Sequence, residues 1–214
     1  MKSTYDGQKT YTKKSLFFYN FRVLFFNNTF VWKCSTKKLL DQFKKYTSRN
    51  HLDIGVGTGF YLDKVRKKII NIDLMDLNNN CLNQVSQVLK DKTPNVYKID
   101  ILKDISSSFY SKYDSISFNY LIHCLPDNGN KDLVFKNVAK MLKQEGVAFG
   151  ATVINDYKND LAIKVSKKYN NIGKFDNKND TYLKIEGYLQ SSFKDYTIEQ
   201  VGSVCLFSMR SPIK

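Results

Sequence analysis

The chain has 214 residues, 42% of them hydrophobic, which is the length of one domain with a single large core. Its four cysteines are scattered, with no Cys-x-x-Cys and no histidine at metal spacing; this argues against a disulfide framework or structural zinc and for a reduced compartment. The formal net charge is +14, which keeps nucleic acid in consideration as a partner.

The first 35 residues differ in composition from the rest. Residues 1–14 are polar, whereas residues 15–32 are strongly aromatic, and we interpret them as a helix with a break near Asn27-Asn28. We expect residues 1–35 to form a lid over a substrate pocket; the alternative is a helix that only packs on the core. The candidates for substrate contact in this lid are Tyr19, Phe26 and Trp32.

The apolar run over residues 16–26 follows two lysines, as in a signal peptide. Asn20 and Arg22 interrupt the run, however, and no small-residue cleavage site follows it. No stretch approaches the roughly 18 apolar residues of a membrane span. We therefore expect a cytoplasmic protein with no membrane partner.

The most informative stretch is 51–59. We expect a helix before it, capped by Ser35 or Thr36. A short apolar run carries Asp53 and leads into three glycines at every second position: Gly55, Gly57 and Gly59. A strand, a glycine turn and a helix form the start of a nucleotide-binding unit, because glycine lets a ligand approach the backbone closely. A carboxylate before the turn would repel a pyrophosphate, but it suits a cation such as an amino-acid ammonium beside a sulfonium.

Two further carboxylates stand at the ends of predicted strands. Asp76 ends the second strand, twenty-three residues after Asp53, close to the spacing at which a carboxylate accepts the two hydroxyls of a ribose. Asp73 is the competitor for this role, but it lies inside the strand. Asp100 lies at the end of the third predicted strand, 95–101.

Residues 113–125 are expected to form the fourth strand and its exit, which carry Asn119, Tyr120 and His123. Parallel sheets bind ligands at the carboxyl ends of their strands, so these side chains are expected to face the transferred group. A neutral imidazole could accept a proton from a phenol, enol or ammonium, which makes His123 a candidate catalytic base. A packing or backbone-bonding histidine is the alternative. The other histidine, His51, is expected to precede the first strand, away from the chemistry.

The rest of the chain continues the alternation of helices and strands. We predict a helix over 130–143, a turn at 143–146, a strand over 147–153, a helix over 181–193, and two closing strands over 196–201 and 204–209. The polar segment 154–180, with a helix near Leu161, Val165 and Tyr169, is either a substrate-specific insertion or a solvated connection.

The glycine motif and the strand-end residues resemble those of class I S-adenosylmethionine (SAM)-dependent methyltransferases. Trp32-Lys33-Cys34-Ser35 and the string from Asn119 to Pro126 are similar to a group of small bacterial members that act on small molecules. The resemblance implies a doubly wound, seven-stranded, mostly parallel α/β sheet with one antiparallel strand, under an N-terminal aromatic helical lid. Residues 36–214 would form the SAM-binding domain. The implied cofactor-binding residues are Asp53, Gly55, Gly57, Gly59, Asp76, Leu77, Asp100, Ile101, Asn119 and Tyr120.

The function implied by this resemblance is methyl transfer from SAM to an oxygen, nitrogen or carbon of a small molecule, with S-adenosylhomocysteine (SAH) as the product and no metal. A nucleic-acid methyltransferase is one alternative, supported by the charge alone. Thirty of the 34 basic residues are lysines spread along the chain, and arginine, the usual reader of bases and phosphates, is scarce. A non-catalytic subunit is the other alternative, against which the intact motifs argue.

Overall fold

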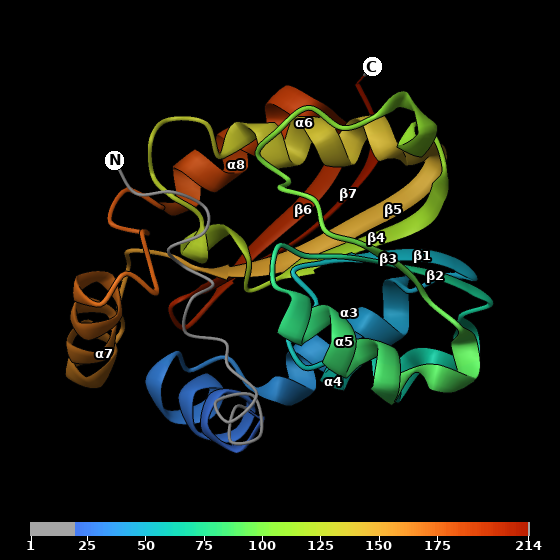
Figure 1. Ribbon diagram of the computed structural model, residues 1–214. Coiled ribbons are helices and arrows are strands. Elements are labelled where there is room, and N and C mark those ends of the chain that lie inside the picture. Colours follow the sequence, from blue (N-terminus) through green and yellow to red (C-terminus); the bar gives the residue numbers. More distant parts are fainter. Residues whose placement is uncertain (1–19, 214) are drawn as a thin grey trace.

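The computed structural model describes residues 20–213, with side chains described from Phe26 onward. Seven strands form one sheet in the order β3-β2-β1-β4-β5-β7-β6 (Figure 1). Strands β1 to β5 pair in parallel, and β7 is antiparallel to both of its neighbours, so the predicted seven-stranded sheet with one antiparallel strand is confirmed. The strands are β1 (Asn50–Ile54), β2 (Asn71–Met75), β3 (Asn95–Tyr97), β4 (Tyr113–Asn119), β5 (Leu142–Val153), β6 (Phe193–Val201) and β7 (Val204–Pro212).

Helices cover both faces of the sheet (Figure 1). One face carries α3 (Thr36–Tyr46), α4 (Phe60–Val65) and α5 (Asn79–Val88), and the other carries α6 (Asp132–Met141) and α8 (Tyr182–Ser192). Helix α7 (Asp160–Asn171) stands at one end of the sheet beside the π-helix η1 (Asn20–Val31). Short 3-10 turns fill several connections, and one of them, η5 (Ile122–Cys124), follows β4.

Polar residues in front of the helices explain where these begin. The side chains of Ser35 and Asn78 accept hydrogen bonds from backbone N–H groups in the first turns of α3 and α5, as their sequence positions predicted. Asn159 and Thr181 cap α7 and α8 in the same way. Each cap satisfies an N–H group that the first turn of a helix leaves without a partner.

Two hydrophobic clusters hold the layers together. Phe118, Phe135 and Phe207 pack beneath α6 and α8, whereas Phe43 and Phe149 belong to the cluster beneath α4 and α5. A third cluster joins the segment after η1 to the sheet and to α7, through residues that include Val31, Trp32, Ala151, Tyr169 and Val204. The N-terminal segment from Val31 is therefore part of the core.

Several expected boundaries are wrong: β6 begins at Phe193 and β7 ends at Pro212, beyond the expected strands over 196–201 and 204–209. Three further differences have a visible cause. Helix η1 runs through Asn27-Asn28 without a break, because the buried Asn27 and Asn28 amides donate to Tyr169 and Thr36, at 3.2 and 3.0 Å. Strand β3 ends at Tyr97, level with the last residue of β2, so Asp100 lies beyond it. Strand β5 begins at Leu142, through the expected turn at 143–146, because Leu142 pairs with Tyr113 on β4 before a register shift.

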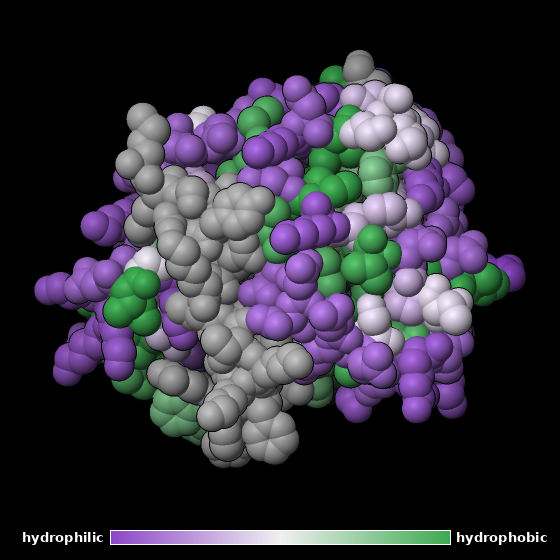
Figure 2. All heavy atoms as spheres, viewed as in Figure 1, coloured by the Kyte–Doolittle hydropathy of each residue, from purple (hydrophilic) through white to green (hydrophobic). Residues whose placement is uncertain are grey.

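Along the stretch from residue 20 to 213, no helix is long and apolar enough to cross a membrane. Hydrophilic side chains surround the visible face, with hydrophobic residues in small separate groups between them (Figure 2).

Candidate functional site

A cavity opens at the carboxyl ends of the central strands. It encloses about 760 Å³ of space between atoms, part of which is open to solvent. Gly55 comes from the end of β1, Asp76 from that of β2 and Asn119 from that of β4, and Asp100 follows β3. A second, smaller cavity adjoins it at Asn119 and Tyr120 and is lined by the glycine turn. The fold thus brings these four predicted residues together.

The glycine turn after β1 depends on a backbone that only glycine adopts without strain. Gly55, Gly57 and Gly59 all have positive φ angles, of 72, 53 and 74°. A Cβ at Gly55 would lie 3.1 Å from Leu121, and one at Gly59 would lie 3.0 Å from Val85. The turn is therefore shaped both by its own conformation and by close packing against neighbouring elements.

Asp76 lines the larger cavity at the turn between β2 and α5. Its carboxylate accepts a hydrogen bond from the Asn78 backbone N–H at 2.8 Å. Burial raises the pKa of Asp76 to about 6, although hydrogen bonds from its own turn and from the backbone at Val56 and Gly57 act in the opposite direction. The hydrogen bonds from Val56 and Gly57 link Asp76 directly to the glycine turn.

Asp73, the competitor, has a different environment. Its carboxylate accepts hydrogen bonds from Lys112 and Tyr113, each at 2.7 Å, and from Asn95 at 2.8 Å. These partners satisfy it inside the sheet, away from the lining of the larger cavity. The geometry therefore favours Asp76 over Asp73 as the ligand-facing carboxylate.

The other end of the larger cavity is formed by the segment after β3. Asp100 is buried and accepts a hydrogen bond from the Leu102 backbone N–H at 3.0 Å, which fixes its side chain in a tight turn. Leu77 and Ile101 line the same cavity and supply apolar surface. This part of the cavity lining therefore combines apolar surface with one carboxylate.

Asn119 lines both cavities, whereas Asp53 belongs to the smaller one. Asp53 lines the smaller cavity and accepts a short hydrogen bond from the Ser117 hydroxyl. Burial raises the pKa of Asp53 to about 7, opposed by the Ser117 bond and supported by the charge of Asp76. Both amide atoms of Asn119 are buried with no hydrogen-bond partner among residues 20–213. Because a buried polar group without a partner is costly, this amide indicates a missing ligand.

Tyr120 follows Asn119 in an unusual conformation. Its φ angle is 56°, in the left-handed region that non-glycine residues rarely adopt, and its N–H donates to the Ala151 carbonyl at 2.7 Å. Strained residues of this kind cluster at functional sites, where the surrounding structure holds them. The bond to β5 is such a constraint, and it fixes the exit of β4 at the cavity wall.

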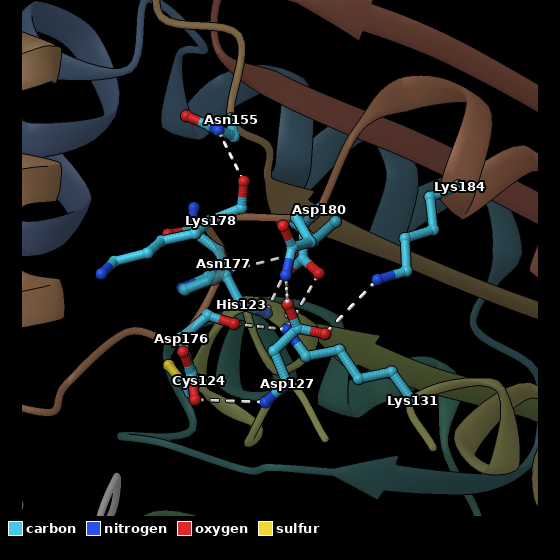
Figure 3. Close-up of polar contacts among 12 residues, drawn as sticks. His123, Cys124, Asp127, Lys131, Asn155, Asp176, Asn177, Lys178, Asp180 and Lys184 are labelled. Atoms are coloured by element: carbon cyan, nitrogen blue, oxygen red, sulfur yellow. Dashed lines mark hydrogen bonds and ion pairs between the residues drawn. The ribbon is translucent and has the colours of Figure 1, made fainter. Parts of the chain in front are cut away.

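His123 lies behind Tyr120, outside the linings of both cavities. Its Nδ1 accepts a hydrogen bond from the Val153 backbone N–H at 3.2 Å and lies 3.1 Å from the Thr152 hydroxyl. Burial, together with the positive charge of Lys131, lowers its pKa to about 3. The carbonyl of His123 also accepts from the Asp176 backbone N–H, at 2.8 Å (Figure 3). These contacts favour the packing alternative.

Of the three lid candidates, Tyr19 lies outside the described residues. Phe26 is half-exposed and packs against Phe30, with ring centroids 5.5 Å apart. Trp32 is buried, its ring centroid lies 5.9 Å from that of Phe175, and it lines neither cavity. Neither Phe26 nor Trp32 therefore lines either of the two cavities.

Several residues that line the two cavities were not predicted from the sequence. Phe43 of α3 and Tyr61 of α4 stack at 4.9 Å and both line the smaller cavity. Phe43 lies on the buried face of α3, and an apolar residue on such a face does not show in the sequence whether it lies in the core or at a cavity wall. The larger cavity is also lined by Met75, Cys81, Leu121, Cys124 and Leu125.

This arrangement fits SAM. The acidic residue beside the glycine turn suits the ammonium of its amino-acid part, Asp76 suits the ribose hydroxyls, and the pocket at Asp100 suits an adenine ring. The orphaned Asn119 amide, which can both donate and accept, lies between these parts.

Comparisons with known proteins find methyltransferases. A family model described as a methyltransferase domain matches residues 52–148. The physcion biosynthesis cluster O-methyltransferase of Aspergillus chevalieri is 32% identical over 216 residues, covering 98% of this chain and 96% of that protein. The N-methyltransferase vrtF of Penicillium aethiopicum is 33% identical over 187 residues, covering 85% and 78%.

The fold is also that of solved methyltransferase structures. The N-methyltransferase NodS from Bradyrhizobium japonicum WM9, in complex with SAH, is similar with a TM-score of 0.62 at 15% identity, covering 83% of this chain and 88% of that one. With relatives above 30% identity matched over most of their length, the chain belongs to the class I SAM-dependent methyltransferases.

Proposed function

We propose that the protein transfers the methyl group of SAM to a small-molecule acceptor. The observation that carries this proposal is the junction of the two cavities. Asp76 and Asp100 line one side of it, Asp53 and the glycine turn line the other, and Asn119 and Tyr120 border both. A ligand with an adenosine part and an amino-acid part would span this junction. The relatives named as O- and N-methyltransferases support a small acceptor.

Each site residue then has a physical role. Asp76 would accept the ribose hydroxyls, Asp100 would accept from the adenine amino group, and Asp53 would face the ammonium. SAM supplies an electrophilic methyl group on a sulfonium when it is bound. The chain contributes position and exclusion of water, which can supply a large part of a rate enhancement. Backbone N–H groups at Leu77 and Ile101 and the Asn119 amide would complete the cradle.

We infer a packing role for His123 in place of the catalytic base. Its Nδ1 already accepts a hydrogen bond, so in the neutral ring the proton resides on Nε2, and a pKa near 3 makes it a weak base. The acceptor would then release its proton to solvent after methyl transfer, or it would lose this proton before it binds. His123→Gln should keep turnover within about tenfold, whereas loss of a general base costs about 10²–10⁴-fold.

The acceptor side is formed in this proposal by residues 1–35 and the insertion 154–180. Asn27 donates to the Tyr169 hydroxyl at 3.2 Å, and Asn159 donates to the Val31 carbonyl at 2.9 Å. These bonds join the N-terminal segment to α7 beyond the carboxyl ends of β4 and β5. An aromatic cover at this place would seal an apolar acceptor from water, with Phe26 and Tyr19 as candidate contacts. Deletion of residues 1–14 should reduce acceptor turnover more than SAH affinity.

The test uses two acceptors with one skeleton. SAH binding is measured by calorimetry, and labelled SAM is then supplied with 1-naphthol or with 1-naphthylamine, so that only the nucleophile differs. Transfer to either one supports a small-molecule methyltransferase and identifies the acceptor atom. Absence of SAH binding would overturn the cofactor assignment. SAH binding with transfer only to RNA would support a nucleic-acid enzyme instead, and binding without transfer to any of these would support a non-catalytic subunit.

A further inference from the structure

A line of buried polar groups runs through the middle of the sheet to Asp53. His51 lies within β1, fully buried, and the expectation that it precedes the strand is wrong. Its two ring nitrogens contact two hydroxyls of β4: Nδ1 lies 2.7 Å from Ser115 Oγ and Nε2 lies 3.0 Å from Ser117 Oγ. Ser117 also donates to Asp53, which lines the smaller cavity.

The outer end of the line is fixed by the backbone. The Ser48 N–H donates to Ser115 Oγ at 2.8 Å. His51, Ser115 and Ser117 have no exposed surface, and the ring of Phe149 on β5 covers His51 at 6.1 Å. Polar groups in the centre of a sheet are costly, and apolar residues would fill the same space at lower cost. The continuous connection to a cavity residue therefore requires a reason beyond packing.

The direction of these bonds depends on the ionisation of Asp53. Burial lowers the pKa of His51 to about 3, so its ring is neutral and carries one N–H. An ionised Asp53 only accepts, so Ser117 donates to it and the ring proton must reside on Nε2 to serve Ser117. A protonated Asp53 can donate to Ser117 instead. Ser117 then donates to Nε2, and the ring proton resides on Nδ1, facing Ser115.

We propose that His51 and Ser117 are positioning residues that hold Asp53 ionised and oriented for the cofactor ammonium, and that the tautomer of His51 follows the ionisation of Asp53. This proposal rests on the role assigned to Asp53 under the proposed function. On ionisation, one proton leaves Asp53 for the solvent, the Ser117 hydroxyl turns from His51 to Asp53, and the ring proton changes from Nδ1 to Nε2. Neither residue contacts the methyl group.

The charges around Asp53 explain why such a relay is useful. Asp76 faces it from the end of β2 and disfavours its negative charge, as does burial. Ser117 from β4 is the group that acts in favour of that charge, and His51 from β1 holds the Ser117 hydroxyl in the donating direction. The positive charge of the cofactor ammonium would further stabilise the negative charge of Asp53 when the cofactor binds.

The first experiment reads the tautomer in the full-length wild-type protein. The chain has two histidines, so nitrogen NMR of protein labelled at histidine gives two rings, which His123→Gln assigns. Below about pH 5.5 the His51 ring should carry its proton on Nδ1, and above about pH 8 on Nε2, because Asp53 ionises between these values. Addition of SAH at about pH 6.5 should produce the high-pH form. The ring of His123, whose Nδ1 accepts from Val153, is the internal control and should not change.

The second experiment separates positioning from simple packing. Ser117→Ala should weaken SAH binding at pH 7 by about 10- to 100-fold, as expected for a lost hydrogen bond to a charged group, and should shift the pH dependence of binding upward. Ser117→Thr, which keeps the hydroxyl, should restore both. A lower melting temperature in Ser117→Ala with an unchanged pH profile would show a packing role only. A His51 tautomer that changes with neither pH nor SAH would overturn the relay. Absence of SAH binding in the wild type would overturn the proposed function and the role of Asp53 toward an ammonium, but a tautomer that still follows the pH would show the link between His51 and Asp53.

Discussion

Asp53 couples ligand binding to pH at the level of a single residue. Its folded pKa of about 7 lies above the unfolded value of 3.8, so the folded state binds more protons between these values. The charge of Asp53 therefore destabilises the ligand-free protein as the pH rises through this window. A bound ammonium needs the ionised form, so SAH binding releases this proton. Below about pH 7, SAH affinity should rise by up to about tenfold per pH unit.

Calorimetry in buffers of different ionisation enthalpy would measure the released proton. Asp53→Asn should bind SAH weakly with a flatter pH profile, and its melting temperature relative to the wild type should rise from about pH 4 to about pH 7. Asp76, whose pKa is raised to about 6, contributes a weaker dependence at lower pH. A wild-type affinity that stays constant over this range would contradict the assignment of Asp53.

The two aspartates of the second strand provide a matched pair. Asp76→Ala should weaken SAH binding by about 1.5–3 kcal/mol, the value of hydrogen bonds to a charged group, with a small change in stability. Asp73→Ala should lower stability and change SAH affinity little, because Asp73 accepts hydrogen bonds from Lys112 and Tyr113 inside the protein. Calorimetry and thermal unfolding of both variants check this. Equal SAH affinity in the wild type and Asp76→Ala would transfer the role elsewhere.

Residues that end a strand were predictable, and residues joined across strands were not. Asp53, Asp76 and Asn119 follow from one rule, that parallel sheets present ligand sites at the carboxyl ends of strands. The relay from His51 to Asp53 depends on which residues of β1 and β4 lie side by side, and this register is not visible in the spacing of either strand. The predicted position of His51 was therefore wrong. The position of His123 after β4 suggested a catalytic base, whereas its hydrogen bond with β5 favours a packing role.

At the scale of elements, a buried ion pair joins the end of the insertion to Lys131, the residue that precedes α6. Lys131 donates to both carboxylate oxygens of Asp180, at 2.8 and 2.9 Å, and to the Asp176 carbonyl at 2.7 Å (Figure 3). Neither Lys131 nor Asp180 has exposed side-chain surface. Asn177 donates to the Val153 carbonyl at 3.2 Å in the same region. The end of the insertion is therefore fixed in place, and is more than a solvated connection.

Breaking this pair should be costly because it leaves one charge buried alone. Lys131→Met should lower the free energy of unfolding by about 3–5 kcal/mol, and the double variant Lys131→Met/Asp180→Leu should recover much of the loss. The single tryptophan, Trp32, lies 5.9 Å from Phe175 and reports unfolding of this region by fluorescence. Lys136→Met, which removes an exposed ion pair with Asp132, is the control and should cost under about 1 kcal/mol. Equal losses in the two single variants would contradict the buried pair as a stabilising contact.

Element boundaries were predictable where a local signal sets them. Ser35 and Asn78 mark the beginnings of α3 and α5 because their side chains cap the first turn. The prediction of a break in η1 was wrong because the side chains of Asn27 and Asn28 donate to Tyr169 and Thr36. A local sequence pattern does not reveal these partners. The length of β3 likewise depends on its neighbour β2.

At the scale of the whole molecule, the charge of +14 is the feature that argues for nucleic acid. Several lysines are already paired with carboxylates, including Lys112 with Asp73, Lys143 with Asp114 and Lys158 with Asp156. In Figure 2, hydrophilic side chains lie all around the visible face and do not gather in one stripe. The cavity itself is lined mostly by apolar and acidic residues. The net charge therefore does not by itself mark a nucleic-acid site, and the proposal of a small acceptor stands on the relatives with that activity.

Salt dependence distinguishes these two classes of acceptor. A protein that makes several phosphate contacts loses about 10³-fold or more in affinity between about 50 and 200 mM salt, because bound counterions are released. A small neutral acceptor in an apolar cavity releases none. Turnover of the active naphthyl acceptor should therefore change by less than about twofold over this range, and total RNA should neither accept methyl groups nor compete. Steep loss of methyl transfer with salt, together with inhibition by RNA, would show that the lysines form the acceptor site and that the cavity holds the cofactor alone.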